Sequence, residues 1–334
     1  MKKIAILGAG SWGLTLAWLS TGNGKDVWLW SRNPDKIAQY QQNRHVTFPV
    51  EVTLPEELNL TSNLAEAVQD ADLVLMVVTS SGTRETALAL KNCGALSPNA
   101  VIVNASKGIE FPSLKSMSQV IEEALPQNPT AVLSGPSLAK EILAGLPTAS
   151  VIACKDEAMA EHIQQNLSRN LFRLYSNTDV VGVEMGGALK NIFAIASGYM
   201  QAKKMGDNSR AAFITRGLAE MTRFCTALGA EEQTLYGLSG LGDLLATCNS
   251  PLSRNYQVGY RLAQGENLEE ILTGLKVVAE GVKTTHAVKE LSAKVGVDTP
   301  IVQLVELSFT GVLSEEMMVK SLMSRKLKSE QAVF

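Results

Sequence analysis

The sequence predicts an α/β fold. A Rossmann-type, doubly wound parallel sheet over residues 1–180 precedes an all-α domain over residues 181–334. Three observations support this prediction. Short apolar runs alternate with helical stretches in the first half, which is typical of βαβ units. In the second half apolar residues recur every three to four positions, as on the buried face of a helix. A G-x-G-x-x-G sequence also follows the first apolar run.

Six apolar runs in the first half predict strands that are buried on both faces of the sheet. They occupy residues 4–7, 27–30, 73–78, 101–103, 131–133 and 149–153. The segments between them are long enough for crossover helices. One such helix begins at Asn33-Pro34, where an N-cap residue precedes a proline in the first helical position.

A helical stripe marks the second half of the chain. Its apolar residues are Ile214, Leu218, Met221, Cys225 and Leu228. Further helical segments with short glycine-containing turns follow. Because the pattern changes after Asp179, we place the domain boundary near residue 180.

Composition excludes several classes of function. The 334 residues carry a formal net charge of −3, so nucleic acid is not an expected partner. Hydrophobic residues make up 46% and charged residues 19%, which is ordinary for a soluble globular protein. The longest purely aliphatic run, Leu73 to Val78, is far shorter than the ~20 residues of a membrane span, so a membrane-embedded chain is not expected.

The cysteines and histidines narrow the chemistry. None of the cysteines (Cys93, Cys154, Cys225 and Cys248) forms a C-x-x-C pair, which favours reduced thiols and a cytoplasmic location. The only histidines are His45, His162 and His286, and they are scattered. We therefore expect no metal site, and we expect any proton transfer to use a group other than histidine.

The glycine motif predicts a dinucleotide site. Gly8 permits a tight turn, Gly10 lets the backbone approach a pyrophosphate, and Gly13 permits close packing of helix and strand. Ser11 and Trp12 lie between the last two glycines. The helix that begins here would offer N–H groups and the positive end of its dipole to the phosphates.

The tip of the second predicted strand bears on the choice of cofactor. Its sequence, Trp30-Ser31-Arg32-Asn33, lacks the acid that usually binds the 2′-hydroxyl of NAD. Arg32 stands where a cation could pair with a 2′-phosphate, which favours NADPH, or tolerance of both NADPH and NADH. An arginine exposed on a loop is the competing interpretation.

Lys190 is a candidate proton-transfer residue in a mostly apolar helical stretch. Gly186 and Gly187 lie four and three residues before it, on the same helix face. Two glycines in a helix interior suggest that a nicotinamide or substrate approaches the backbone there. Tight helix packing would also explain the glycines, but not the lysine.

Two further segments offer polar groups to a phosphorylated substrate. Ser239-Gly240-Leu241-Gly242-Asp243 predicts a glycine-flanked loop that presents one carboxylate. Ser253-Arg254-Asn255 places two hydrogen-bonding side chains around a guanidinium, a combination suited to binding phosphate.

Together these motifs resemble those of the bacterial NAD(P)-dependent sn-glycerol-3-phosphate dehydrogenases, over nearly the whole chain. The matching segments are Gly8 to Gly13, Ser106-Lys107-Gly108, Ser134-Gly135-Pro136-Ser137, Leu189-Lys190-Asn191, Gly240 to Asp243, and Ser253-Arg254-Asn255. The resemblance implies reversible hydride transfer between NAD(P)H and dihydroxyacetone phosphate. The product, sn-glycerol 3-phosphate, would serve glycerophospholipid synthesis.

The resemblance also implies roles for individual residues. The catalytic residues would be Lys190, Asp243 and Lys107, with Lys190 transferring the proton. The cofactor would contact Ser11, Trp12, Arg32, Lys107, Ala139, Arg254, Val278 and Glu280. The substrate would contact Lys107, Gly135, Ser137, Lys190, Asn191, Asp243, Ser253, Arg254 and Asn255.

Two segments depart from the family pattern. Val78-Thr79-Ser80-Ser81 lacks an expected proline, and Asn104-Ala105-Ser106 matches only in part.

Two alternative functions stay open. One is a 3-hydroxyacid or 6-phosphogluconate type of dehydrogenase on the same plan, and the other is a catalytically silent dinucleotide sensor. Apolar helical stripes in the second half are also compatible with a homodimer.

Overall fold

The computed structural model describes the chain except for residues 23, 276–278, 312–315, 318–319, 321–328 and 330–334. The chain forms two compact units. The first unit comprises Met1–Lys107 and Lys115–Val180, and the second comprises Gly108–Leu114 and Val181–Phe334. The predicted division into two contiguous segments did not include this short excursion. Ile109 and Leu114 explain it, because both are buried in the apolar core of the second unit.

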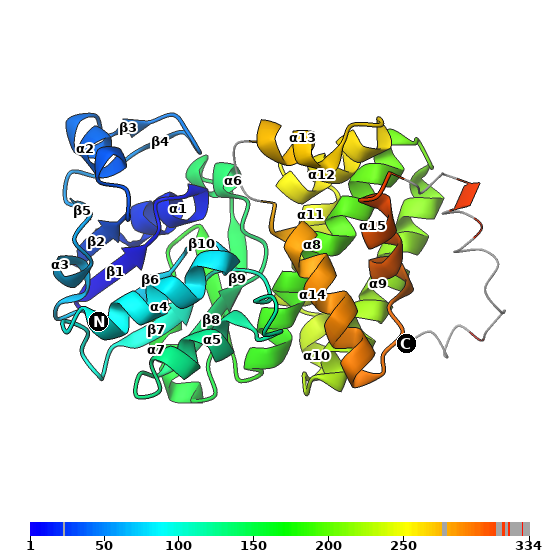
Figure 1. Cartoon of the computed structure of the whole chain (residues 1–334). Coiled ribbons are helices and arrows are strands. Elements are labelled where there is room, and N and C mark those ends of the chain that lie inside the picture. Colours follow the sequence, from blue (N-terminus) through cyan, green and yellow to red (C-terminus); the bar gives the residue numbers. More distant parts are fainter. Residues whose placement is uncertain (23, 276–278, 312–315, 318–319, 321–328, 330–334) are drawn as a thin grey trace. The chain divides into compact units, whose positions relative to one another are not determined.

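The first unit contains an eight-stranded sheet in the order β10-β9-β8-β7-β6-β1-β2-β5 (Figure 1). The strands are β1 (Lys3–Leu7), β2 (Asp26–Trp30), β5 (Asn59–Thr61), β6 (Leu73–Met76), β7 (Val101–Asn104), β8 (Thr130–Ser134), β9 (Thr148–Ala153) and β10 (Phe172–Asn177). The strands from β5 to β8 are parallel, as predicted. β9 instead runs antiparallel to β8, so the sheet is mostly, not wholly, parallel.

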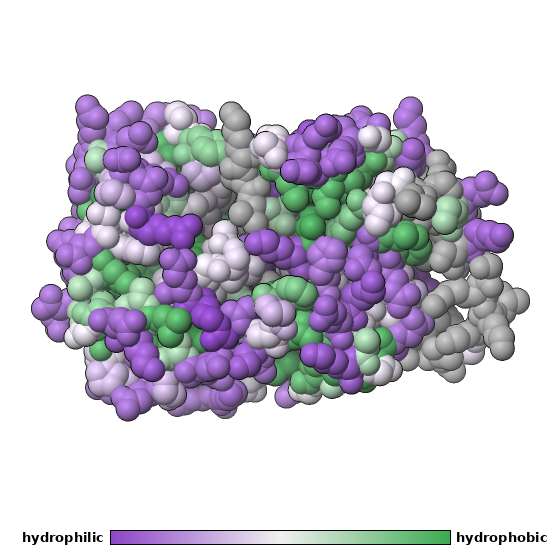
Figure 2. Space-filling model, viewed as in Figure 1, coloured by the Kyte–Doolittle hydropathy of each residue, from purple (hydrophilic) through white to green (hydrophobic). Residues whose placement is uncertain are grey.

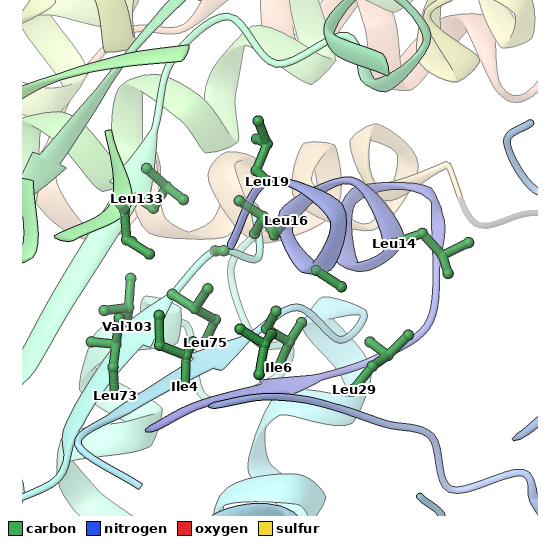
Figure 3. Packing of buried hydrophobic residues seen from close by; sticks show 14 of the residues in the cluster. Ile4, Ile6, Leu14, Leu16, Leu19, Leu29, Leu73, Leu75, Val103 and Leu133 are labelled. Carbon is green, nitrogen blue, oxygen red and sulfur yellow. The ribbon is translucent and has the colours of Figure 1, made fainter. Parts of the chain in front are cut away.

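Helices cover both faces of this sheet because side chains alternate along each strand. Ile4 and Ile6 of β1 belong to one apolar cluster, whereas Ala5 and Leu7 belong to another. The first cluster includes residues of α1 (Ser11–Ser20), α2 (Pro34–Gln42) and α7 (Glu157–Leu167). The second includes residues of α3 (Leu64–Val68), α4 (Thr83–Asn92) and α5 (Met117–Ala124). Figure 3 shows Leu16 and Leu19 of α1 above the sheet residues of the first cluster.

Several short elements were not predicted from the sequence. They are β3 (His45–Val46), β4 (Val52–Thr53), β5 and β10. The short helix α6 (Ala139–Leu143) lies in one of the segments predicted to be long enough for a crossover helix. β3 and β4 form a separate antiparallel pair. The predicted strand over residues 73–78 ends earlier, at Met76. Conversely, the helix predicted at Asn33-Pro34 is confirmed, since the Asn33 side chain accepts a hydrogen bond from the Lys36 backbone N–H.

The described part of the second unit is mostly helical after Val181. Its helices are α8 (Val180–Ala202), α9 (Asp207–Ala227), α10 (Glu232–Leu235), α11 (Asp243–Cys248), α12 (Arg254–Ala263), α13 (Leu268–Gly274), α14 (Glu280–Val295) and α15 (Pro300–Ser308). The predicted stripe lies on α9, where Leu218, Met221 and Cys225 are buried. One turn of π-helix, Leu238–Gly242, leads into α11.

The long helix α8 is the centre of this unit. By length and composition alone it could cross a membrane, but 89% of its most apolar window is buried inside the protein. This burial identifies it as a core helix. Figure 2 shows hydrophilic residues over most of the visible surface, with smaller hydrophobic areas between them.

Candidate functional site

The glycine motif in the first unit forms the turn that the sequence predicted. Gly8 has φ of +121°, and a Cβ there would lie 2.4 Å from the Val77 carbonyl oxygen. A Cβ at Gly13 would lie 1.8 Å from the Gly8 carbonyl oxygen. Both positions therefore require glycine for reasons internal to the fold, one for its conformation and one for close packing.

Gly10 differs, because a Cβ there would meet nothing within 4 Å. Gly10 is the N-cap of α1 and has no side chain to cap the helix. The first N–H groups of α1 thus begin beside open space, which is the arrangement that binds a phosphate. The turn and helix fit the pyrophosphate of a dinucleotide, and Ser11 and Trp12 lie in the first turn of that helix.

Arg32 lies just beyond β2 and is well exposed. Its guanidinium pairs with the carboxylate of Glu85 on α4 at 3.3 Å, and both side chains are about three-quarters exposed, at 77% and 74%. An ion pair this exposed contributes little to stability. Arg32 is therefore available for exchange with an anionic ligand at low cost.

Lys107, Gly135 and Ser137 come together in the first unit. The Lys107 ammonium donates a hydrogen bond to the Gly135 carbonyl at 3.0 Å and lies 3.4 Å from the Ser137 hydroxyl oxygen. β7 and β8 are adjacent and parallel, so the segments that follow them meet at one edge of the sheet. Ligands of doubly wound folds bind at this edge, the carboxyl ends of the strands. Ala139 is the first residue of the short helix α6.

The two segments that depart from the family pattern are ordered. Thr79 has φ of −65°, which is the value that a proline would impose. The Ser106 hydroxyl donates a hydrogen bond of 2.6 Å to the Val78 carbonyl. Asn104 accepts from the Ser106 N–H at 3.0 Å. The loop over residues 79–81 thus begins with the backbone conformation that a proline would impose, although Thr79 occupies that position.

The second unit places Lys190 in a buried polar cluster. Lys190 is only 8% exposed. Its ammonium donates to Asp243 Oδ1 at 2.5 Å and to Thr247 Oγ1 at 2.7 Å. A buried ammonium is stable only when it is paired and hydrogen-bonded, and this cluster provides both conditions.

The sequence did not single out Thr247, although a signal was present. Asp243 and Thr247 are four residues apart, so on α11 they share one helix face. The Thr247 hydroxyl also lies 3.4 Å from Asp243 Oδ1. The cluster therefore needs only two elements, α8 and α11, to hold three polar side chains.

The predicted loop before Asp243 is instead the π-helical turn, and Asp243 is the first residue of α11. This turn also explains Gly186, since a Cβ there would lie 2.8 Å from the Ser239 carbonyl oxygen. For Gly186 the helix-packing interpretation is thus correct, and the expectation of a ligand against the α8 backbone at that residue is wrong.

Cys248 lies beside this cluster but is not a competing acid or nucleophile. Burial raises the pKa of its thiol to about 12, although the charge of Lys190 acts in the opposite direction. The thiol is therefore neutral at physiological pH. All four cysteines belong to the described part of the chain and are reduced thiols.

Asn191 and Asn255 form a second buried polar group. Asn255 Nδ2 donates to Asn191 Oδ1 at 2.8 Å, and Asn255 Oδ1 accepts from the Gly281 N–H at 3.0 Å. A Cβ at Gly281 would lie 2.7 Å from the Asn191 carbonyl oxygen. These bonds join α8, α12 and the first turn of α14, and they fix the orientation of both amides.

Arg254 begins α12 and is exposed. Ser253 is the N-cap, and its hydroxyl accepts from the Tyr256 N–H at 3.3 Å. Protein around the guanidinium lowers the pKa of Arg254 by desolvation, and the Glu280 carboxylate partly opposes this. Arg254, the α12 N-terminus and the Asn255 amide thus concentrate donors at one place. Val278, predicted to contact the cofactor, lies outside the described residues.

Across the described ranges no group of three or more His, Cys, Asp or Glu side chains could hold a metal ion.

The residues predicted to bind the cofactor and the substrate fall into four local groups. The first unit holds the glycine turn with Arg32 and the Lys107 group. The second holds the Lys190 cluster and the Asn255–Arg254 group.

Comparisons with known proteins agree with these features. The family model for the NAD-dependent glycerol-3-phosphate dehydrogenase N-terminus matches residues 3–160, and the model for the C-terminus matches residues 179–323. Glycerol-3-phosphate dehydrogenase (NAD(P)+) of Citrifermentans bemidjiense is 44% identical, with 98% of this chain and 99% of that protein covered. The protein of the same name from Nitratidesulfovibrio vulgaris is 45% identical, with 98% and 100% covered.

A solved structure agrees as well. The crystal structure of glycerol-3-phosphate dehydrogenase from Coxiella burnetii matches with a TM-score of 0.91 and 35% identity, covering 97% of this chain and 99% of that one.

Proposed function

The chain belongs to the NAD-dependent glycerol-3-phosphate dehydrogenase family, and we propose that it reduces dihydroxyacetone phosphate with Lys190 as the proton donor. It is an NAD(P)-dependent oxidoreductase by its relatives and its fold. The observation that carries the proposal is the buried cluster in which Lys190 is held by Asp243 and Thr247. A lysine on the water-facing side of a helix would instead extend its ammonium toward water.

Lys190 supplies the proton that ketone reduction requires. When bound, the reduced nicotinamide supplies a hydride to the substrate carbonyl carbon. Negative charge then develops on the carbonyl oxygen, where the Lys190 ammonium donates a hydrogen bond and then a proton. In the reverse direction the neutral amine takes the hydroxyl proton.

Asp243 and Thr247 orient this lysine. The Asp243 carboxylate accepts a hydrogen bond from the Lys190 ammonium, which is the form that donates in reduction. Thr247 Oγ1 accepts a second hydrogen bond, so two of the three ammonium hydrogens are committed to the protein. One N–H remains for the substrate oxygen, and its direction is set by the other two.

Arg254 supplies the main charge for the substrate phosphate. Its guanidinium presents a planar fork of donors that suits a phosphate. Ser253 and Asn255 flank it, and the α12 N-terminus adds N–H groups and a positive dipole end. Holding the phosphate here would fix the position of the reacting carbon.

By family resemblance, the Lys107 group would contact the substrate and the cofactor. The hydrogen bond to the Gly135 carbonyl fixes the position of the Lys107 ammonium. The cofactor itself would be held by the glycine turn, Ser11 and Trp12, with Ala139, Arg254, Glu280 and Val278 as further contacts by family resemblance. Arg32 and the lack of an acid after β2 favour NADPH over NADH.

We also propose a setting for this activity. The product would serve glycerophospholipid synthesis in the cytoplasm. The four reduced cysteines and the buried location of α8 support a cytoplasmic chain that is not embedded in a membrane. A homodimer formed by the second unit is an independent proposal, supported by exposed Leu245 and Leu252, and sedimentation equilibrium tests it.

The decisive experiment is an assay of purified protein with dihydroxyacetone phosphate, with NADPH and NADH in parallel. We expect oxidation of both, faster with NADPH at equal low concentration. Oxidation of 6-phosphogluconate or a 3-hydroxy acid without reduction of dihydroxyacetone phosphate would assign the chain to another dehydrogenase type. NADPH binding with no turnover of any of these compounds would identify a dinucleotide sensor.

A further inference from the structure

A second cation lies beside the glycine turn and has no part in the function described above. Lys36 is in the first turn of α2, which directly follows β2. Its ammonium donates a hydrogen bond of 2.6 Å to the carbonyl oxygen of Ala9, the residue between Gly8 and Gly10. The bond brings a charge from the helix after β2 onto the turn that follows β1.

This place has a defined meaning in dinucleotide-binding folds. The adenosine ribose lies between the glycine turn and the tip of the second strand, where an acid binds the 2′-hydroxyl in NAD enzymes. In this chain the turn and the strand tip are joined directly, since the Gly8 N–H donates to the Trp30 carbonyl at 2.9 Å. The Lys36 ammonium, which is bound to the Ala9 carbonyl, therefore lies next to the expected position of the ribose.

The charge of Lys36 is poorly compensated. In the described part of the chain no carboxylate forms an ion pair with it, and burial lowers the pKa of its ammonium. Its other contact is with the ring of Tyr40, with Nζ 5.7 Å from the ring centre. The Ala9 carbonyl uses one of the three ammonium hydrogens, which leaves two for an anion.

Arg32 offers a weaker contact than Lys36. It is exposed and already shares its charge with Glu85, so an incoming phosphate must compete with that carboxylate. Lys36 is half-buried and tethered, so it loses less conformational freedom on binding. The same low accessibility to water strengthens its attraction for a phosphate.

We propose that Lys36 is a specificity-determining residue that binds the 2′-phosphate of NADPH from the side of the glycine turn. This inference rests on the proposed NADPH preference and extends it to a residue other than Arg32. Both cations would bind the phosphate, Lys36 tethered to the turn and Arg32 at the strand tip. Without Lys36, Arg32 would have to bind the phosphate alone.

The test measures binding instead of turnover, by calorimetry with adenosine 2′,5′-bisphosphate and with 5′-AMP. The two probes differ only in the 2′-phosphate. For wild-type protein we expect tighter binding of the bisphosphate. For Lys36→Met we expect that ligand to weaken by about 10- to 100-fold, while 5′-AMP changes little. Lys36→Arg, which keeps a cation, should restore most of the difference.

Lys155→Met serves as the matched control. Lys155 lies in the same unit and is 76% exposed, where it pairs with Glu122, so both ligands should bind as they do to wild type. Unchanged bisphosphate affinity in Lys36→Met would overturn the proposal. Equal weakening of both ligands would also overturn it, because Lys36 would then act only by holding the glycine turn. Equal affinity of the wild-type protein for adenosine 2′,5′-bisphosphate and 5′-AMP would also overturn the proposal.

These outcomes are separate from the proposed reaction. If dihydroxyacetone phosphate were not reduced while Lys36→Met still lost selective bisphosphate binding, only the proposed function would fail.

Discussion

In the first unit the groups that face the expected phosphates are mostly backbone N–H groups, whereas in the second unit they are side chains held in buried networks. Gly8 and Gly13 allow the tight turn, and Gly10 leaves open space at the start of α1, where we propose that the phosphates bind. Lys190, Asp243 and Thr247, the proposed proton-transfer site, are joined by hydrogen bonds between α8 and α11. A site made of backbone follows from local sequence, but a network between helices depends on how the helices pack.

The comparison implies that the two functions can be separated by mutation. Substitutions at the polar residues of the second unit should lower kcat or raise the KM for the substrate. Substitutions in the glycine turn should weaken cofactor binding or destabilise the fold.

The largest effect is expected for Lys190→Met. We expect kcat to fall by about 10²- to 10⁴-fold, the typical contribution of a positioned proton donor. NADPH affinity, measured by fluorescence titration, should stay near that of wild type, which also shows that the variant is folded. Turnover close to wild type would remove Lys190 from the proton-transfer role.

Arg254→Ala should act on the substrate. Loss of a charge-assisted contact to the phosphate predicts a rise of about 10- to 100-fold in the KM for dihydroxyacetone phosphate. Steady-state kinetics at saturating NADPH measure it. Arg261→Ala is a control on the same helix, α12, because Arg261 pairs with Glu266 near its other end. An unchanged KM in Arg254→Ala would contradict the phosphate assignment.

Two glycine variants test the backbone-built site. Gly13→Ala forces a Cβ toward the Gly8 carbonyl and should destabilise the protein by about 1–3 kcal/mol, measured by urea unfolding. Gly10→Ala should barely affect stability, since φ is −82° and a Cβ meets nothing, yet it should weaken NADPH binding several-fold. If Gly10→Ala destabilised the protein as much as Gly13→Ala does, Gly10 would not border open space that a ligand could fill.

The last effect is one of pH, and it concerns Glu220, a buried side chain of α9. It accepts hydrogen bonds from the Ile301 and Val302 N–H groups at 3.0 Å each, at the start of α15. Burial raises its pKa to about 7, against those two bonds and Arg223, while Asp298 adds to the rise. The folded state therefore holds this proton to higher pH than the unfolded state does.

This shift predicts the sign of a pH dependence. The contribution of Glu220 to stability is present below pH 4.5 and is lost as pH rises toward about 7, by about 3 kcal/mol at most. Glu220→Gln should flatten that part of the stability profile in urea unfolding at several pH values. Exposed Glu290→Gln is the control. A profile in Glu220→Gln identical to that of wild type would contradict the raised pKa.

Much of the fold could be predicted because its signals are local. The central strands, the Asn33 cap and the glycine turn each follow from residues adjacent in the chain. The edge strand β10 was missed because its sequence, Phe172–Asn177, alternates buried and exposed residues and lacks a continuous apolar run. The antiparallel direction of β9 was missed as well, since an apolar run carries no information on strand direction.

The residues available for chemistry can be read from the sequence. It supplied a lysine in an apolar helix, an arginine at a helix start and three glycines in one turn, and its scarcity of histidine directed attention to Lys190. The tertiary structure alone decided their partners. Thr247 joined Lys190, Asn255 bonded Asn191, and Lys36 reached Ala9, because hydrogen bonds between segments far apart in the chain depend on packing.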